Sequence, residues 1–140
     1  MIDDDLRARL ARLADGLIPG TAEMPAPSAI GIAGAQLDVV LASRPDLADG
    51  VERALGAAPP AGDPIAWVEE LRAIDPVAYD ALVTAIVAGY YMHRDVQRRL
   101  GYPGQQPQPV VADPYPAYVH EGLLERVYER GPIYRPTPGT

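Results

Sequence analysis

The chain has 140 residues and a mass of 15.0 kDa, which fits a single domain. It contains no cysteine and no lysine, and its formal net charge is −7. The absence of cysteine excludes disulfides, thiolate nucleophiles and cysteine-ligated metal centres. The absence of lysine excludes Schiff-base chemistry and the phosphate-binding lysine of a P-loop. The acidic charge argues against a nucleic-acid partner, and no run of ~18 apolar residues is present to span a membrane.

The N-terminal segment predicts an amphipathic helix and no export signal. Its apolar face is formed by residues at helical spacing, Leu6, Leu10, Leu13 and Leu17. Asp3, Asp4 and Asp5 stand at the positive end of this helix, and Pro19-Gly20 ends it. Acids occupy the place where a secretory signal has basic residues, and no apolar stretch or twin-arginine pair follows. We therefore expect a cytoplasmic protein, while export together with a partner that carries its own signal stays open.

Two further helices are predicted in the first half of the chain. Ser28 is a candidate N-cap for a helix over 29–42. Gly31 and Gly34 either weaken this helix or allow another helix to approach it closely. A shorter helix is expected from Pro45 to about Leu55, followed by a proline-containing loop.

Two Asp-Pro pairs mark clear helix starts in the middle of the chain. Asp63-Pro64 and Asp75-Pro76 each place an acid at the N-cap and proline at the first helical position. The first pair predicts a helix through Leu71. The second opens the longest apolar pattern of the chain, over 77–91. The width of that pattern predicts a helix that is buried on much of its surface at the centre of a bundle.

The composition of the chain changes near residue 101. The long helix is expected to continue or restart at Arg94 and to end at Leu100-Gly101, with glycine as the C-terminal cap. Beyond it, prolines and tyrosines are frequent, and only 119–130 favours a helix. We therefore predict an all-α fold, with a small bundle of about five to six helices over 1–100. An extended Pro/Tyr-rich tail with one short helix is expected over 101–140.

The tail has more large apolar and aromatic residues than a solvated tail needs. Extended backbone with such side chains is typical of a segment that binds along the surface of another protein. The alternative is that the tail wraps back over its own bundle, and the residues alone leave both interpretations open. If the tail binds a partner, we expect the chain to have more apolar and aromatic surface than a body of 15.0 kDa covers by itself.

Few side chains of the chain are suited to catalysis or metal binding. His93 and His120 are its histidines, and neither Ser28 nor Ser43 lies in a G-x-S-x-G motif. His120-Glu121 is an adjacent pair, without the spacing that puts two ligands on one helical face. We therefore predict no catalytic, cofactor-binding or metal-binding residue in this chain.

A small basic group, Arg94, Arg98 and Arg99, stands near the end of the predicted long helix. Arginines at this place interact favourably with the C-terminal carbonyl groups of a helix. They are also suited to contact an acidic or planar surface of a partner. The sequence leaves both roles open.

Three stretches together resemble a known family. They are LADGLIPG at 13–20, AGYYMHRDVQRRLGYPG at 88–104 and RGPIYRPTP at 130–138. A long helix that ends in GYY, followed by a short charged helical turn and LGYPG, is the most specific of these features. On these motifs the chain resembles the gluconate 2-dehydrogenase subunit 3 family, the small companion subunits of flavin-dependent oxidoreductases of the glucose–methanol–choline type.

The resemblance implies a helical, non-catalytic small subunit that carries no cofactor of its own. Its partner would be a large FAD-binding subunit that oxidises sugars or related alcohols, in a heterodimer or a higher heteromer. Some members of the family have a twin-arginine signal, and some complexes include a multihaem cytochrome. This chain has neither that signal nor a C-x-x-C-H motif. Since the chain differs from those members, we expect a cytoplasmic complex in which the large subunit is a sugar or glycoside dehydrogenase or oxidase.

We predict that the partner binds tyrosines, arginines and one proline at the end of the long helix and in the tail, because interfaces favour Tyr and Arg. The predicted partner-binding residues are Tyr90, Tyr91, Arg94, Tyr102, Pro103, Tyr115, Tyr118, Tyr128, Tyr134 and Arg135. Two alternatives stay open. One is a stand-alone helical interaction module or homodimer, and the other is a small enzyme that uses His93 or His120 with a carboxylate.

Overall fold

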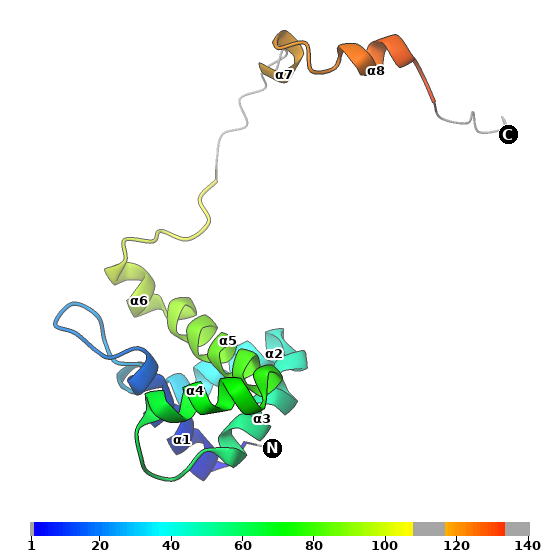
Figure 1. The fold of residues 1–140 in the computed structure, drawn as a ribbon. Helices are drawn as coiled ribbons and strands as arrows, with labels where there is room; N and C mark the ends of the chain where they lie inside the picture. Colours follow the sequence, from blue (N-terminus) through cyan, green and yellow to red (C-terminus); the bar gives the residue numbers. More distant parts are fainter. Residues whose placement is uncertain (1, 108–116, 134–140) are drawn as a thin grey trace, which may run out of the picture. The chain divides into compact units, whose positions relative to one another are not determined.

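The structure, a computed structural model, describes residues 2–107 and 117–133. The chain divides into two compact units, Met1–Gln105 and Gln106–Thr140, and each is considered by itself. The helices of the first unit (Figure 1) are α1 (Asp4–Leu17), α2 (Leu37–Ser43), α3 (Ala48–Ala57), α4 (Pro64–Ile74), α5 (Pro76–Met92) and α6 (Arg94–Arg99). The described residues contain no strand, so the predicted all-α fold is confirmed. Within the same residues, no helix is long and apolar enough to cross a membrane.

Aspartate N-caps begin three of these helices, and two of them, at Asp63 and Asp75, were predicted. Asp3 accepts a hydrogen bond from the Leu6 N–H at the start of α1, at 3.0 Å. Asp63 and Asp75 cap α4 and α5 in the same way, and each is followed by proline at the first helical position. Each cap satisfies a backbone N–H that the helix itself leaves without an acceptor. The helix after Asp63 runs to Ile74, three residues beyond its predicted end.

Helix α5 lies at the centre of the bundle and contacts α2, α3, α4 and α6, which confirms its predicted position (Figure 1). Its buried residues are Ala78, Ala81, Leu82, Ala85, Ile86, Gly89 and Tyr90. Val77, Val87 and Tyr91 belong to the predicted apolar pattern but are exposed. The pattern counted only large apolar residues, whereas the buried face of α5 consists largely of alanine and glycine. These small residues let the neighbouring helices approach closely.

Helices α3 and α5 approach each other closely. A Cβ atom added at Gly50 of α3 would lie only 2.5 Å from the Cβ of Ala81. By contrast, no atom lies within 4 Å of such a Cβ at Gly31 or Gly34. The suggestion that Gly31 and Gly34 admit a close helix is therefore wrong, and Gly50 has that role.

The predicted helix over 29–42 is also wrong in its first half. The segment forms a 3₁₀ turn at Ser28–Ile30 and a single π-helical turn at Ile32–Gln36 before α2 begins. Gly31 has a φ of 69°, and Gly34 has φ −98° and ψ −125°, outside the helical region. Glycine adopts both conformations at little steric cost, and this interrupts the α-helix.

Ser28 does not cap a helix with its side chain. Instead, its backbone N–H donates a hydrogen bond to Asp15 Oδ1 in α1, at 2.8 Å. The next predicted helix is confirmed, as a 3₁₀ turn at Pro45–Leu47 that leads into α3. Helix α3 ends at Ala57, two residues beyond the predicted end.

The described part of the second unit contains α7 (Ala117–His120) and α8 (Glu125–Arg130). A turn separates these helices, and Gly122 within it has a φ of 70°. The prediction of one continuous helix over 119–130 is therefore wrong, because Gly122 adopts a left-handed conformation. No residue of 117–133 is buried.

Candidate partner-binding surface

The last turn of α5 and the short helix α6 hold in place the loop over 18–27 that follows α1, which we call the N-terminal loop. Tyr90 is only 1% exposed, and its hydroxyl donates a hydrogen bond to the carbonyl oxygen of Pro25 at 2.8 Å. Arg99 donates to the carbonyl oxygen of Glu23 in the same loop, also at 2.8 Å. Burial raises the pKa of Tyr90, and Tyr91 adds to this effect. Tyr90 thus belongs to the core of the chain and does not present its side chain to a partner, in contrast to its predicted place among the partner-binding residues.

Helix α6 restarts after α5 through a histidine cap. His93 Nδ1 accepts a hydrogen bond from the N–H of Asp95 at 3.3 Å. The main-chain carbonyl of Tyr91 accepts a hydrogen bond from the Gln97 side chain at 3.0 Å, which ties α6 to the end of α5. His93 therefore has a structural role as the N-cap of α6.

Helix α6 ends in a Schellman motif that fixes the direction of the next residues. The N–H of Tyr102 donates to the carbonyl oxygen of Gln97 at 2.9 Å, and the N–H of Gly101 donates to that of Arg98 at 3.1 Å. Gly101 has a φ of 67°, so its predicted role as the C-terminal cap is confirmed. The motif turns the chain back along α6.

An open groove results, which we call the α6 groove. It is lined by Arg94, Gln97, Arg98, Tyr102, Pro103 and Gly104, and its volume is about 470 Å³. Three predicted partner-binding residues, Arg94, Tyr102 and Pro103, thus come together in one place. Tyr102, which lines the groove, is 54% exposed. Tyr91, at the end of α5 and shortly before Arg94 in the sequence, is 51% exposed.

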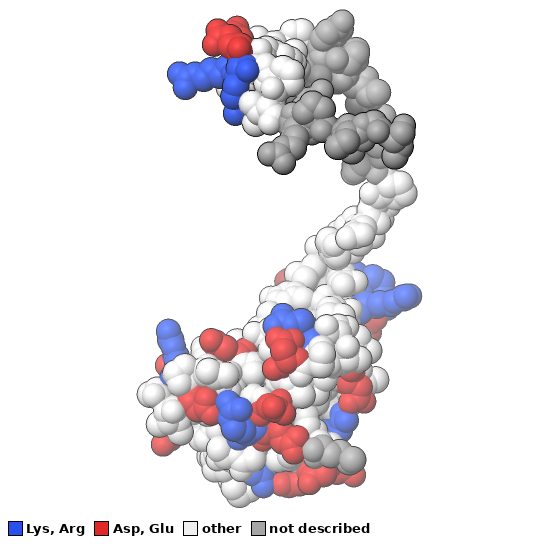
Figure 2. All heavy atoms as spheres, turned by 90° about the vertical axis from the view of Figure 1, so that its right-hand side faces the viewer, with Lys and Arg blue, Asp and Glu red and all other residues white. Residues whose placement is uncertain are grey.

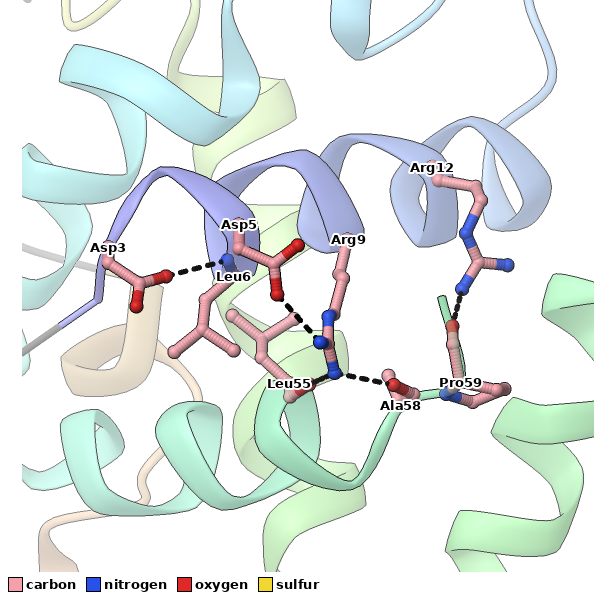
Figure 3. Close-up of polar contacts among 8 residues, drawn as sticks. All are labelled: Asp3, Asp5, Leu6, Arg9, Arg12, Leu55, Ala58 and Pro59. Carbon is pink, nitrogen blue, oxygen red and sulfur yellow. Dashed lines mark hydrogen bonds and ion pairs between the residues drawn. The ribbon is translucent and has the colours of Figure 1, made fainter. Parts of the chain in front are cut away.

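The arginines of α1 serve the bundle itself. Figure 3 shows Arg9 bound to Asp5 and to the carbonyl oxygens of Leu55 and Ala58. Arg12 donates to the carbonyl oxygen of Pro59. These bonds tie α1 to the end of α3 and to the loop that follows it. The α1 arginines are therefore occupied by internal acceptors.

The surface of the bundle carries acidic and basic side chains in a mixed arrangement, with arginines gathered at the end where α6 lies (Figure 2). Helix α6 contains Arg94, Arg98, Arg99 and one acid, Asp95. Arg98 forms an ion pair with Asp95, and Arg99 binds the N-terminal loop as described above. The side chain of Arg94 makes no hydrogen bond or ion pair with the chain over its described ranges. The α6 groove is thus a locally basic site in an acidic chain.

The segment 117–133 carries the other predicted residues that the structure describes. Tyr118 in α7 and Tyr128 in α8 are 49% and 69% exposed. Three predicted residues, Tyr115, Tyr134 and Arg135, lie outside the described residues.

The structure also shows exposed apolar residues that the prediction did not name as partner-binding. They include Met92 and Leu100 near α6 and Leu123, Val127 and Ile133 in the segment 117–133, and others lie elsewhere on the bundle: Val39, Ile65, Ile74, Val77 and Val87. The sequence contained a signal for part of this set, since Leu123 and Val127 are apolar residues four positions apart in the last predicted helix. The prediction gave weight to tyrosine and arginine and passed over these aliphatic residues.

No group of three or more metal-ligating side chains that is suited to hold an ion occurs in the ranges 2–107 and 117–133. The clearest electrostatic effects are found at surface ion pairs. A hydrogen bond from Arg53 lowers the pKa of Asp75, and the backbone N–H of Ala78 adds to this. Likewise, a hydrogen bond from Arg44 lowers the pKa of Asp46. Ion pairs at such exposed positions contribute little to the stability of a fold.

No family model, curated protein or solved structure matches this chain. The features that bear on function are therefore those of the chain itself: the α6 groove and the uncovered apolar residues of 117–133.

Proposed function

We propose that this chain is a non-catalytic small subunit that binds and stabilises a larger protein through its C-terminal region. One observation carries the proposal. The segment 117–133 places large apolar residues on its surface, and none of its residues is buried. Apolar side chains that stay in contact with water lose the stabilisation of burial, ~25 cal/mol for each Å². A partner that covers them recovers this free energy.

The position of these residues supports binding through α8 and the turn before it. Val127 and Tyr128 lie in α8 and are 48% and 69% exposed, and Leu123, in the turn before the N-cap Leu124, is 66% exposed. Short helices with exposed apolar residues bind in apolar grooves of other proteins. Helix α8 has six residues, and a helix of that length gains most of its stability from contacts with other elements.

We further propose that the partner is a large FAD-binding subunit of a sugar or glycoside dehydrogenase or oxidase, and that the flavin is held by that subunit. The support for this step is the resemblance of the motifs at 13–20 and 88–104 to the small-subunit family. The residues of these motifs have clear structural roles in the bundle. Tyr90 and Arg99 hold the loop that follows Leu17, and Gly101 ends α6.

Co-expression tests the proposal directly. The chain is expressed with the product of the neighbouring reading frame as the candidate flavoprotein, and the mixture is analysed on a sizing column with detection of flavin absorbance. We expect the chain and the flavin to elute together in one peak. A matched chain that ends at Gln105 keeps the bundle and lacks 106–140, and we expect it to elute apart from the flavoprotein. Separate elution of the full chain, or its elution as a homodimer alone, contradicts the proposal.

A further inference from the structure

The α6 groove has the features of a binding site for a carboxylate group. Arg94 and Arg98 line it, and the Schellman motif at the end of α6 holds Tyr102 against the same space. The guanidinium group of arginine is planar and presents paired N–H donors that match the two oxygens of a carboxylate. An aromatic ring beside it supplies apolar contact for the chain that carries the carboxylate.

Arg94 differs from the other arginines of the bundle. Each of the others makes a hydrogen bond or an ion pair with the described part of the chain: Arg7, Arg9, Arg12, Arg44, Arg53, Arg72, Arg98 and Arg99. Arg94 is exposed and has no such partner within 2–107 or 117–133. Its guanidinium group is therefore available to an acceptor on another molecule.

The charge of the site selects an acidic ligand. Three arginines and one aspartate within Arg94–Arg99 give this short helix an excess of positive charge, while the whole chain has a net charge of −7. A partner with a diffuse positive surface would be attracted to most of this acidic chain. Only a ligand with negative charge prefers α6 over the rest of the molecule.

We propose that the α6 groove binds an acidic segment of the partner protein, with a carboxylate of that segment paired to Arg94 and an adjacent apolar side chain against Tyr102. This inference rests on the proposed function, since it assigns a second contact to the same partner. The groove is open, and its lining belongs to a single helix and the turn after it. Such a site suits an extended segment better than a folded domain.

A peptide titration tests the groove without the flavoprotein. The full chain is labelled with ¹⁵N and titrated with a capped peptide of alternating glutamate and leucine, and separately with the matched peptide in which glutamine replaces glutamate. We expect amide shifts concentrated in 94–104 with the acidic peptide alone. We also expect Arg94→Ala to remove most of them. Equal shifts with the glutamine peptide, or shifts spread over α1–α4, overturn the proposal.

The complex provides the second arm of the test. We expect Arg94→Glu to raise the Kd for the flavoprotein by at least about tenfold, because a charge pair becomes a like-charge contact. Arg72→Glu is the matched control, since Arg72 is an exposed arginine on the separate helix α4. It is expected to change the Kd by less than about twofold.

The two arms separate the two proposals. If the wild-type chain does not bind the flavoprotein but the acidic peptide shifts the amide signals of 94–104, the proposed function fails. The assignment of a carboxylate-binding site to the α6 groove then still holds. If the flavoprotein binds Arg94→Glu as tightly as the wild-type chain, the groove proposal is overturned and the proposed function stands.

Discussion

The bundle at 2–105 and the segment at 117–133 contain similar apolar residues but differ in how they cover them. In the bundle, leucines, alanines and Tyr90 form one core, and no polar or charged residue is buried within the described chain. In the segment, two short helices display leucine, valine and tyrosine to solvent. The first region therefore has a core of its own, whereas the second has no buried residue, and the proposed function assigns the covering of its apolar side chains to a partner. The comparison predicts that replacing a buried apolar residue of the bundle lowers the free energy of unfolding. Replacing an exposed apolar residue of the segment should leave that free energy nearly unchanged and weaken the binding of the partner.

The largest loss of stability is expected at the centre of the bundle. Leu82 of α5 is fully buried, so Leu82→Ala leaves a cavity and is expected to lower the free energy of unfolding by about 2–5 kcal/mol. Val77→Ala, on the exposed side of the same helix, is the matched control and is expected to change it by less than about 0.5 kcal/mol. Urea unfolding followed by circular dichroism measures both. Equal effects of the two variants would contradict the assigned core.

Two glycines of α3 offer a test of the close approach to α5. Gly50→Ala places a methyl group 2.5 Å from Ala81, and the helices must separate to accommodate it. We expect a loss of about 1–3 kcal/mol. Gly56→Ala makes the same change in the same helix, where nothing lies within 4 Å. It is expected to stabilise the chain by up to about 1 kcal/mol, because alanine favours the helix. Thermal unfolding of the pair gives the sign of each effect, and a stabilising Gly50→Ala would refute the close contact.

The bundle was largely predictable from the sequence because its signals are local. An aspartate followed by proline defines a helix start within two residues, and this is why α4 and α5 begin where expected. The π-helical turn at Ile32–Gln36 and the break at Gly122 depend on backbone conformations that glycine permits but does not require. The sequence pattern alone does not distinguish a helical glycine from a left-handed one.

The candidate site was predictable only in part, since one of its predicted residues, Tyr90, takes part in a contact between distant parts of the chain. Arg94, Tyr102 and Pro103 were predicted as partner-binding residues, and the Schellman motif explains why they share one groove. Tyr90 was grouped with them on the basis of its residue type. Its burial depends on Pro25, which is 65 positions away in the chain. Such a contact has no local signal in the sequence.

Tyr90 gives the next prediction, which concerns the loop that it holds. Tyr90→Phe removes the hydrogen bond to Pro25 and is expected to cost about 1 kcal/mol. The folded-state pKa of Tyr90 is raised, so its contribution is complete below the unfolded value of about 10 and is lost as the pH rises through the folded value. We therefore expect urea unfolding to show a smaller alkaline loss of stability for Tyr90→Phe than for the wild-type chain. The exposed control Tyr128→Phe should retain the wild-type loss, and an unchanged alkaline loss in Tyr90→Phe would argue against the buried hydroxyl.

A smaller effect is expected on the acid side. The folded-state pKa of Asp75 is lowered, chiefly by Arg53, so its contribution is present above the unfolded value of about 3.9 and is lost as the pH falls through the folded value. Asp75→Asn keeps an N-cap for α5 and removes the charge that pairs with Arg53. We expect this variant to lose less stability between neutral and acid pH than the wild-type chain. Glu70→Gln, at an exposed position of α4, is the control that should follow the wild-type acid dependence.

The smallest change in the free energy of unfolding of the isolated chain is expected for substitutions in the segment 117–133. This small change tests directly whether the apolar side chains of the segment are uncovered. Leu123→Ser with Val127→Ser removes two exposed apolar side chains, and their environment in the free chain is already water. The free energy of unfolding should therefore change by less than about 0.5 kcal/mol. The same double variant should weaken co-elution with the flavoprotein strongly, because the proposed interface loses two of its apolar contacts. If the isolated chain instead loses more than about 1 kcal/mol, these residues are covered by the chain itself, and the contrast between the two regions no longer holds.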